Sequence, residues 1–433
     1  MNAYREEYEK KKIDVDRALS LVKSGDMIWT SYNGLEPAAF MSKLHTIAPR
    51  VENVVLRHAG VYRPYPFVMD PACKGHIIPC TGFSDEFTRA VHDTQNTWFI
   101  PTHLHNGFER AGLEETGIDI FVCMVSPMDD RGYFRMSLSV IAEQEASELA
   151  KMIILEVNPN LPQTNGDVEI HISDVDYLYE SEEPIVAFDE AEPGEIDMQI
   201  GKYVADLVPD GATIQLGIGN IPNAAAQYFM EKNDLGVHTE MITSSMAKLA
   251  TAGVINGRKK TLHKGKIIGN FALGSQELYS FMDQNPAVWL MRGTYTNNPY
   301  IIAQNDNMIS INSALQVDLV GQVCSESMGS IQYTGTGGAL DFAIGATHSK
   351  GGKSIIAMRS TAKKGTISTI QPVLTPGAIV SIDRNDIDYI VTEYGIAKLK
   401  GVPLAGRVEN LISIAHPDFR DMLREGVKQY KLW

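Results

Sequence analysis

The sequence predicts an α/β protein built from two similar, open α/β domains. Three observations indicate this class. Short apolar runs rich in β-branched residues alternate with amphipathic helical stretches. The order helix, turn, strand, glycine-bearing loop, helix and strand occurs twice, about half a chain apart. The length of 433 residues exceeds what one hydrophobic core supports. We therefore expect two domains that arose by internal duplication.

The first copy of the repeated pattern begins after a charged N-terminal stretch. Its expected elements are, in chain order, a helix over 15–23, a turn over 24–26, a strand over 27–31, a loop with Gly34 and Pro37, a helix to about 48 and a strand over 51–58. A strand, a helix and a second strand in this order form a parallel unit.

The second copy repeats this order in the other half of the chain. Its expected elements are a helix over 196–207, a turn over 209–211, a strand over 212–216, a glycine loop from Gly217, a helix from Pro222 and a strand from Val237. When Gly25 is aligned with Gly211, Pro37 falls within one residue of Pro222. This match is the main support for the duplication.

An acidic segment over residues 179–197 separates the copies. It contains Pro184, Pro193 and Gly194 and has little periodicity, which is typical of a crossing segment. We expect domains over residues 1–190 and 191–433. The other expected strands cover 118–125, 152–157, 266–271, 288–290, 308–320, 354–357, 378–383 and 389–392, and late helices start at Gly401 and His416.

Composition narrows the function. A net charge of −15 and a pI of about 5.2 disfavour nucleic acid and anionic membranes as partners. The four cysteines form no C-x-x-C pair, so a reducing cytoplasm is expected. No run of about 18 apolar residues occurs, and the charged N-terminus does not resemble a secretion signal. We expect a cytoplasmic enzyme.

Two glycine loops are candidates for anion binding. Gly217, Gly219 and Asn220 lie between a strand and a helix, where backbone N–H groups can cradle a phosphate or hold a developing oxyanion. A second loop contains Gly335, Gly337 and Gly338. Either loop is equally compatible with a simple tight turn.

Glu240 is the candidate nucleophile or base. It follows a strand of the same sheet, and a carboxylate that attacks an activated carbonyl forms a covalent anhydride. Glu326 and Glu393 are equal rivals on residue chemistry alone. Glu240 could instead be a solvated cap, and Glu393 could cap the next helix. Asn297 and Asn298 offer amides to a carboxylate, although Asn-Asn-Pro is also an ordinary turn.

Other motifs carry less information. Basic clusters at 258–266 and at 350–364, the latter including Lys350 and Lys353, suit ligand phosphates or a solvated face. His103 and His105 share one side of a possible strand, but no cysteine or carboxylate cluster accompanies them, so no metal site is expected. Ser126 lacks a G-x-S-x-G elbow, which disfavours a serine hydrolase.

Several motifs together resemble one family. They are GIGNIP and GVHTEM at 217–241, NSALQVDLVGQV at 312–323, GTGGALDF at 335–342, VTEYGIAKLKG at 391–401, VSPMDDRGYF at 125–134 and EVNPNLPQTNGD at 156–167. In this order they resemble the acetyl-CoA hydrolase/transferase family of class I CoA-transferases, and within it the 4-hydroxybutyrate and butyryl-CoA:acetate CoA-transferases. Ala339 departs from the glutamine of many relatives, and the loop over 33–37 is only loosely similar.

The resemblance implies a homodimer of two CoA-transferase (NagB/RpiA-like) domains that moves coenzyme A between short carboxylic acids. Glu240 matches the catalytic glutamate, which forms an acyl anhydride and then a glutamyl-CoA thioester. The amides of Ile218 and Gly338 would form the oxyanion hole, and Asn297 and Glu393 would orient the glutamate or contact substrate. Residues assigned to coenzyme A are Gly217, Gly219, Asn220, Gly335, Gly337, Lys350 and Lys353. The alternatives are an acyl-CoA hydrolase with the same glutamate and a non-catalytic sensor of CoA metabolites or sugar phosphates.

Overall fold

The computed structural model describes residues 3–92, 97–106 and 112–432. Its contacts divide the chain into two compact units, which are described separately. Unit 1 comprises Met1–Phe188 and Gly269–Tyr295, and unit 2 comprises Asp189–Ile268 and Thr296–Trp433. The domain boundary near residue 190 stays a prediction. Residues 269–295, which that boundary leaves in the second domain, group with the first unit.

Unit 1 is built on a parallel sheet with the strand order β4-β3-β2-β1-β5-β7-β9. The strands are β1 (Met27–Thr30), β2 (Val54–His58), β3 (Ile77–Thr81), β4 (Trp98–Phe99), β5 (Ile120–Val125), β7 (Ile153–Val157) and β9 (Tyr177–Glu180). Every residue of β5 and β7 is buried, as expected of parallel strands covered on both faces.

The helices of unit 1 are short. They are α1 (Ala3–Lys11), α2 (Val15–Ser20), α3 (Ala38–Lys43), α4 (Pro66–Met69), α5 (Glu86–Ala90), α7 (Leu113–Thr116), α8 (Glu143–Leu149) and α12 (Gln276–Met282), with α13 (Gly293–Thr296) at the edge of the unit. The remaining strands are β6 (Tyr133–Arg135), β8 (Glu169–His171), β14 (Phe271–Ala272) and β15 (Val288–Leu290). Single turns of 3₁₀-helix connect several of them.

Unit 2 carries the order β13-β11-β10-β16-β21-β25-β26, parallel except for the last pair. These strands are β10 (Thr213–Leu216), β11 (Gly236–His238), β13 (Ile267–Gly269), β16 (Met308–Asn312), β21 (Lys353–Ala357), β25 (Tyr389–Thr392) and β26 (Gly395–Lys398). In both sheets the first strand is central, with the strands that follow it directly on one side and later strands on the other. The α/β class with two parallel sheets is confirmed, and the duplication, which this shared order supports, stays a prediction.

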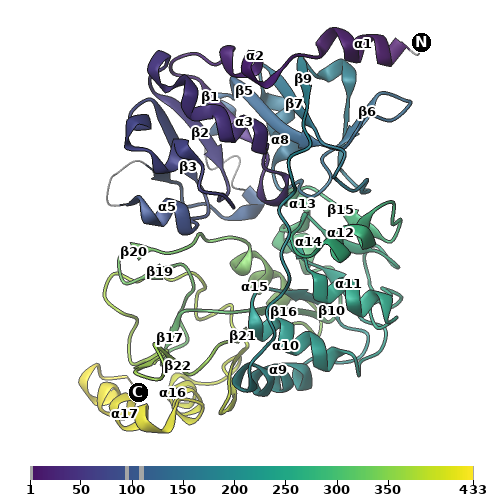
Figure 1. The fold of residues 1–433 in the computed structure, drawn as a ribbon. Helices are drawn as coiled ribbons and strands as arrows, with labels where there is room; N and C mark the ends of the chain where they lie inside the picture. The colour runs from purple at the N-terminus through teal and green to yellow at the C-terminus, as the bar shows by residue number, and fades with distance from the viewer. Residues whose placement is uncertain (1–2, 93–96, 107–111, 433) are drawn as a thin grey trace. The chain divides into compact units, whose positions relative to one another are not determined.

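The helices of unit 2 are longer. They are α9 (Glu195–Leu207), α10 (Asn220–Phe229), α11 (Ser244–Thr251), α14 (Pro299–Ile302), α15 (Ala339–His348), α16 (Leu404–Ser413) and α17 (Arg420–Gln429). Helices α9 and α10 pack side by side (Figure 1). Small strands complete the unit: β12 (Met241–Ile242), β17 (Gln316–Asp318), β18 (Val323–Cys324), β19 (Ser327–Met328), β20 (Ile331–Gln332), β22 (Thr361–Ala362), β23 (Ile367–Ser368) and β24 (Ile370–Gln371).

Two predicted strands of the second half are wrong in detail. The apolar run 308–320 is broken, because β16 ends at Asn312 and β17 belongs to a separate small sheet. Residues 378–383 form no strand. They follow a turn at Gly377, which has a φ of +84°, and Ile379 and Val380 are exposed. Apolar composition alone therefore does not identify a strand.

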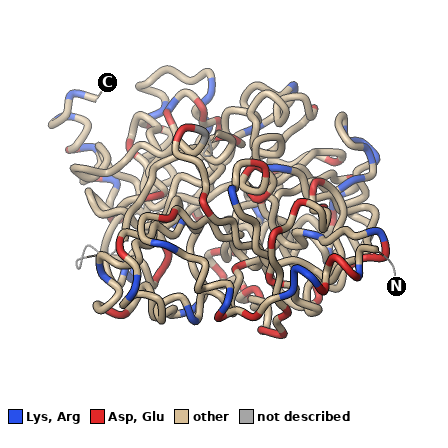
Figure 2. Tube along the Cα trace, turned by 90° about the horizontal axis from the view of Figure 1, so that it is seen from above, with Lys and Arg blue, Asp and Glu red and all other residues tan. Residues whose placement is uncertain are grey.

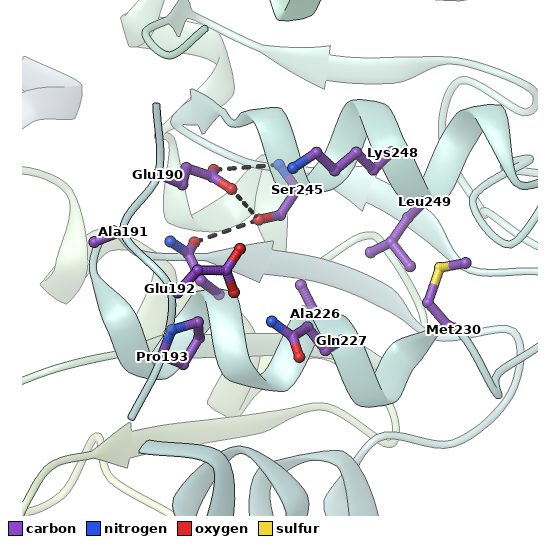
Figure 3. A pocket seen from close by; sticks show the side chains of 11 residues that line it. Glu190, Ala191, Glu192, Pro193, Ala226, Gln227, Met230, Ser245, Lys248 and Leu249 are labelled. Carbon is purple, nitrogen blue, oxygen red and sulfur yellow. Dashed lines mark hydrogen bonds between the residues drawn. The ribbon is translucent and has the colours of Figure 1, made fainter. Parts of the chain in front are cut away.

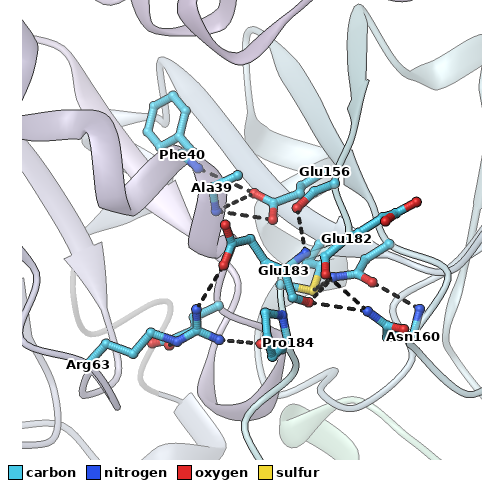
Figure 4. A network of polar contacts seen from close by, with 12 residues as sticks. Ala39, Phe40, Arg63, Glu156, Asn160, Glu182, Glu183 and Pro184 are labelled. Atoms are coloured by element: carbon cyan, nitrogen blue, oxygen red, sulfur yellow. Dashed lines mark hydrogen bonds and ion pairs between the residues drawn. The ribbon is translucent and has the colours of Figure 1, made fainter.

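The acidic segment is anchored separately within each unit. In unit 1, Arg63 contacts Glu183 at 3.4 Å and donates to the Pro184 carbonyl, while Asn158 donates to the Glu183 carbonyl at 2.8 Å (Figure 4). In unit 2, Glu190 accepts a hydrogen bond from the backbone N–H of Ser245 at 3.2 Å. This segment is thus held by specific polar contacts although it has no regular secondary structure.

Charges are spread over the chain. Lysine and arginine residues are interspersed with aspartate and glutamate along the trace (Figure 2). Within the part of the chain that the structure describes, no helix has the length and hydropathy needed to cross a membrane.

Candidate active site

Glu240 follows the carboxyl end of β11 in unit 2. Strands β10 and β11 are parallel with Ile214 opposite Val237, so continuing this register places Gly217 level with Glu240. The glycine loop and the glutamate therefore leave the sheet at the same edge, as the sequence predicts. Glu240 is half-buried as a residue.

Two groups hold the Glu240 carboxylate. The Asn297 side chain donates its Nδ2 hydrogen to Glu240 Oε2 at 2.8 Å, and Asn297 itself is fully buried. The backbone N–H of Gly338 provides a second hydrogen bond. The next residue, Asn298, instead accepts the N–H of Tyr300 at 2.9 Å and begins α14. One asparagine of the Asn-Asn-Pro sequence thus binds the glutamate, and the other forms the turn.

Position 338 has no room for a side chain. It is the N-cap of α15, and a Cβ added to it would lie 1.9 Å from Glu240 Oε2 and 2.0 Å from Asn297 Nδ2. A helix N-terminus carries a partial positive charge, so α15 approaches the carboxylate with the end that stabilises an anion. Only glycine permits this close approach.

The surroundings set the protonation of Glu240. The pKa of Glu240 is raised to about 7. Burial is the largest cause and the nearby Asp341 carboxylate acts in the same direction, while the hydrogen bonds from Asn297 and Gly338 partly offset them. Asp341 is buried in the first turn of α15, and its Oδ2 lies 3.4 Å from Asn297 Nδ2. One buried amide therefore lies between two carboxylates.

His238 contacts the backbone of the residue that precedes Asn297. Its Nε2 lies 2.8 Å from the Thr296 carbonyl, and its Nδ1 lies 3.4 Å from Asn305 Nδ2. Burial, aided by the charge of Lys260, lowers the pKa of His238 to about 3. The ring is consequently neutral, with Nε2–H donating to Thr296 and Nδ1 accepting from Asn305, and it fixes the backbone next to Asn297.

Lys260 corrects the interpretation of its basic cluster as a solvated face. Its side chain is buried, and Nζ donates to the carbonyls of Val237 at 2.6 Å and Lys266 at 2.9 Å. A Cβ on Gly236 would lie 2.3 Å from Lys260 Cγ, so the glycine makes room for the lysine stem. Burial lowers the pKa of Lys260 to about 7. The lysine therefore connects the chain around β11 and β13.

The loop from Gly217 lies over a buried polar network. Gln215 Nε2 donates to Asn312 Oδ1 at 3.0 Å, and Ser310 donates to Gln215 Oε1 at 2.8 Å. Above them Gly219 adopts a φ of +115°, which favours glycine, and Ile218 is exposed. The network gives the exposed loop a rigid base.

Several predicted site residues have other partners. Glu393 accepts from the Ser360 backbone at 2.9 Å and from the Ser360 hydroxyl at 2.6 Å, and the buried Glu326 accepts from Gln332 and Thr336 at 3.2 Å each. These interactions do not join either glutamate to Glu240.

The predicted phosphate ligands divide between the two edges of the sheet. Gly335 and Gly337 belong to the loop that leads into α15. Lys353 begins β21 and donates to the Leu207 carbonyl at 2.6 Å, and Lys350 precedes it, so both lie toward the amino edge, opposite the edge of Glu240. Their assignment to coenzyme A stays a prediction that the strand direction disfavours.

The histidine, cysteine and carboxylate side chains of the described residues form no metal cluster. Within the described ranges no group of three or more histidine, cysteine, aspartate or glutamate side chains is arranged to hold a metal ion. His103 and His105 stack with ring centroids 6.1 Å apart.

A separate pocket lies on unit 2 between α10 and α11. Residues that line it include Asn223, Gln227, Met230, Lys248 and Leu249, with 190–193 along one side (Figure 3). The Glu190 carboxylate points to Ser245 at the start of α11 and accepts its hydroxyl at 2.5 Å. The acidic segment thus borders the pocket instead of crossing open solvent.

Comparison with known proteins gives two family matches. Residues 83–190 match the acetyl-CoA hydrolase/transferase N-terminal domain, and residues 274–427 match the C-terminal domain. A 4-hydroxybutyrate coenzyme A transferase from Clostridium kluyveri is 49% identical, with 98% of this chain and 99% of that protein covered. The chain belongs to the acetyl-CoA hydrolase/transferase family.

Other members of the family agree along the full length. The succinyl-CoA:cyclohexane-1-carboxylate CoA transferase of Geobacter metallireducens is 41% identical over 99% of this chain and 97% of its own. The crystal structure of RipA from Yersinia pestis matches with a TM-score of 0.94 at 36% identity, covering 99% of this chain and 100% of that chain. The predicted family and the predicted enzyme class, CoA transfer, are confirmed.

Sequence reasoning missed three members of the candidate site. Asp341 lies within the motif GTGGALDF and His238 within GVHTEM, but neither motif predicts their contacts. The basic cluster at 258–266 predicts a phosphate site or a solvated face, not a buried Lys260.

Proposed function

We propose that the protein transfers coenzyme A between a short-chain acyl-CoA and a carboxylic acid, with Glu240 as the nucleophile. The observation that carries this proposal is the carboxylate of Glu240, which is held by Asn297 and by the N-terminus of α15. The names of relatives suggest acids such as 4-hydroxybutyrate or butyrate, with acetate as the exchange partner. A cyclohexane-carboxylate enzyme among the relatives supports a carboxylic acid of variable side chain.

In the first half-reaction, a Glu240 oxygen attacks the thioester carbonyl of the acyl-CoA. A C–O bond forms, the C–S bond breaks, and the coenzyme A thiolate leaves with the electron pair. The thiolate then attacks the Glu240 carbonyl carbon of the anhydride and expels the acyl group as a free carboxylate. Glu240 is left as a glutamyl-CoA thioester, with no net proton transfer.

The second half-reaction repeats these steps with the acceptor acid. Its carboxylate attacks the glutamyl-CoA thioester, forms a new anhydride and releases the thiolate, which attacks the acceptor carbonyl and frees Glu240. Each tetrahedral intermediate places a negative charge on oxygen, which two converging N–H donors stabilise. We assign these donors to Ile218 and Gly338, the first in the exposed loop beside Glu240 and the second at the start of α15.

Gly338 has two roles in this scheme. In the free protein its N–H hydrogen-bonds Glu240 itself. Once Glu240 turns toward the thioester, the same donor becomes available for the developing oxyanion. Asn297 then keeps the glutamate in place, while Glu393 is assigned to contact with substrate. We further propose that the active protein is a homodimer, for which sedimentation of the purified protein is the test.

The runner-up function is hydrolysis, which the family description includes. A hydrolase would use the same glutamyl thioester and admit water as the acceptor. The discriminating experiment follows acyl-CoA consumption with and without acetate, butyrate or 4-hydroxybutyrate. Strict dependence on an acceptor acid is expected. Coenzyme A release that proceeds at full rate without an acid would refute transfer. A non-catalytic sensor would bind acyl-CoA and consume none of it, with or without an acid.

A further inference from the structure

A second buried carboxylate accompanies the nucleophile. Asp341 is 1% exposed and Asn297 is fully buried, and the amide nitrogen of Asn297 lies 2.8 Å from Glu240 and 3.4 Å from Asp341. Gly338 brings the first turn of α15 so close that no side chain fits between. Two carboxylates thus flank one buried donor.

We propose that Asp341 is a positioning residue whose negative charge favours the covalently acylated forms of Glu240 over the free carboxylate. This inference rests on the proposed function. Free Glu240 adds a second negative charge beside Asp341, whereas the anhydride and the thioester of Glu240 are neutral. The charge leaves with the thiolate or with the released acid. Acylation therefore relieves a repulsion that burial strengthens.

The Asn297 amide lies near both carboxylates and can donate to either. A buried amide that loses its acceptor is destabilising. When Glu240 moves toward substrate, Asp341 remains as an acceptor for the same Nδ2 group. The amide therefore has a partner before and after the covalent step.

Other charges near Glu240 do not account for the effect. In unit 2, Asp341 is the charged side chain that raises the pKa of Glu240. His238, two residues earlier on β11, is neutral, and the Lys260 Nζ group faces the carbonyls of Val237 and Lys266. Glu393 faces Ser360. The like charge on α15 is thus the one that distinguishes free from acylated glutamate.

The test compares Asp341→Asn with the wild type. Asparagine has the same shape and can still accept from Asn297, but it carries no charge. We expect the acid limb of kcat/KM against pH to move to lower pH by about one unit, a tenfold change in the apparent proton affinity. The fraction of enzyme trapped as the Glu240 thioester at a fixed ratio of acyl-CoA to free acid should fall on the order of tenfold. Asp341→Glu should restore both.

Two controls separate charge from structure. Asp318 is an equally buried aspartate of unit 2 that accepts from Gln322, so Asp318→Asn should lower Tm without moving the acid limb. If Asp341→Asn does not fold, Asp341→Ser supplies the same uncharged comparison. If a folded, uncharged variant shows the wild-type acid limb and the wild-type adduct fraction, the inference about Asp341 is overturned but the proposed function is not. A wild-type enzyme that forms no adduct at Glu240 would overturn the proposed function as well.

Discussion

Gly338→Ala is the sharpest perturbation of the proposed site. The φ of Gly338 is −104°, a value that alanine adopts without strain, so the backbone should tolerate the change. The added Cβ would lie 1.9 Å from Glu240 Oε2, roughly 1.5 Å short of ordinary van der Waals contact. Either the carboxylate or α15 must move by that distance. Because a displacement of about 1 Å in a reacting group costs about 100-fold in rate, we expect kcat/KM to fall at least that much.

The assay is acyl exchange between acyl-CoA and acetate, combined with thermal unfolding. Gly194→Ala is the matched control, since Gly194 is also an N-cap glycine with negative φ, and its added Cβ would have an ordinary contact at 3.7 Å with Asp197. The control should retain wild-type kcat/KM. A Gly338→Ala protein that unfolds like the wild type and exchanges acyl groups at the wild-type rate would refute the assigned geometry.

Further predictions follow from the same contacts. Glu240→Gln should lower transfer by roughly three orders of magnitude or more, because an amide is a poor nucleophile; near-normal rates would move the role to another glutamate. For the wild type, kcat/KM should rise with pH through about 7 as Glu240 ionises, and a flat profile from pH 5 to 9 would contradict this. Burial lowers the folded pKa of Lys260 to about 7, so its contribution to stability should rise with pH by about 1.4 kcal/mol per unit from there to its unfolded pKa. Lys260→Met should remove that slope, measured by urea unfolding at several pH values; an unchanged slope would show that Lys260 is not the cause.

Much of the fold followed from local patterns. The second copy of the repeat predicts β10, its loop and α10 to within about two residues, because glycine and proline mark the change from strand to helix. The prediction of a strand at 378–383 is wrong because Ile379 and Val380 face solvent, and the buried Ile382 forms only an isolated bridge with Val323. Nothing in the local sequence predicts that residues 269–295 group with unit 1. The grouping depends on contacts between distant segments, and the composition does not change where the chain passes from one unit to the other.

Glu240 and the first glycine loop were predictable because strand ends carry their chemistry. Glu240 and the Gly217 loop follow adjacent strands, so the parallel register alone brings them to one edge. Asp341 reaches the site through α15, about 100 residues later in the chain, and no spacing rule predicts that approach. Lys260 was misplaced because a buried lysine is rare, and the space it occupies depends on Gly236.

The lysines at the start of β21 show where strand direction adds to the sequence analysis. A basic residue that precedes a parallel strand lies at the amino edge, away from ligands bound at the carboxyl ends. Lys350 and Lys353 precede or begin β21, so this rule, applied to the sequence, would already have weakened their assignment to coenzyme A.

Covalent trapping tests the central claim most directly. The protein is incubated with acyl-CoA in the absence of acceptor acid, treated with borohydride, digested and analysed by mass spectrometry. We predict that the peptide containing Glu240 carries a side chain reduced from the thioester to the alcohol, and that Glu240→Gln carries none. A wild-type peptide with unmodified Glu240, or modification at Glu326 or Glu393 instead, would contradict the account.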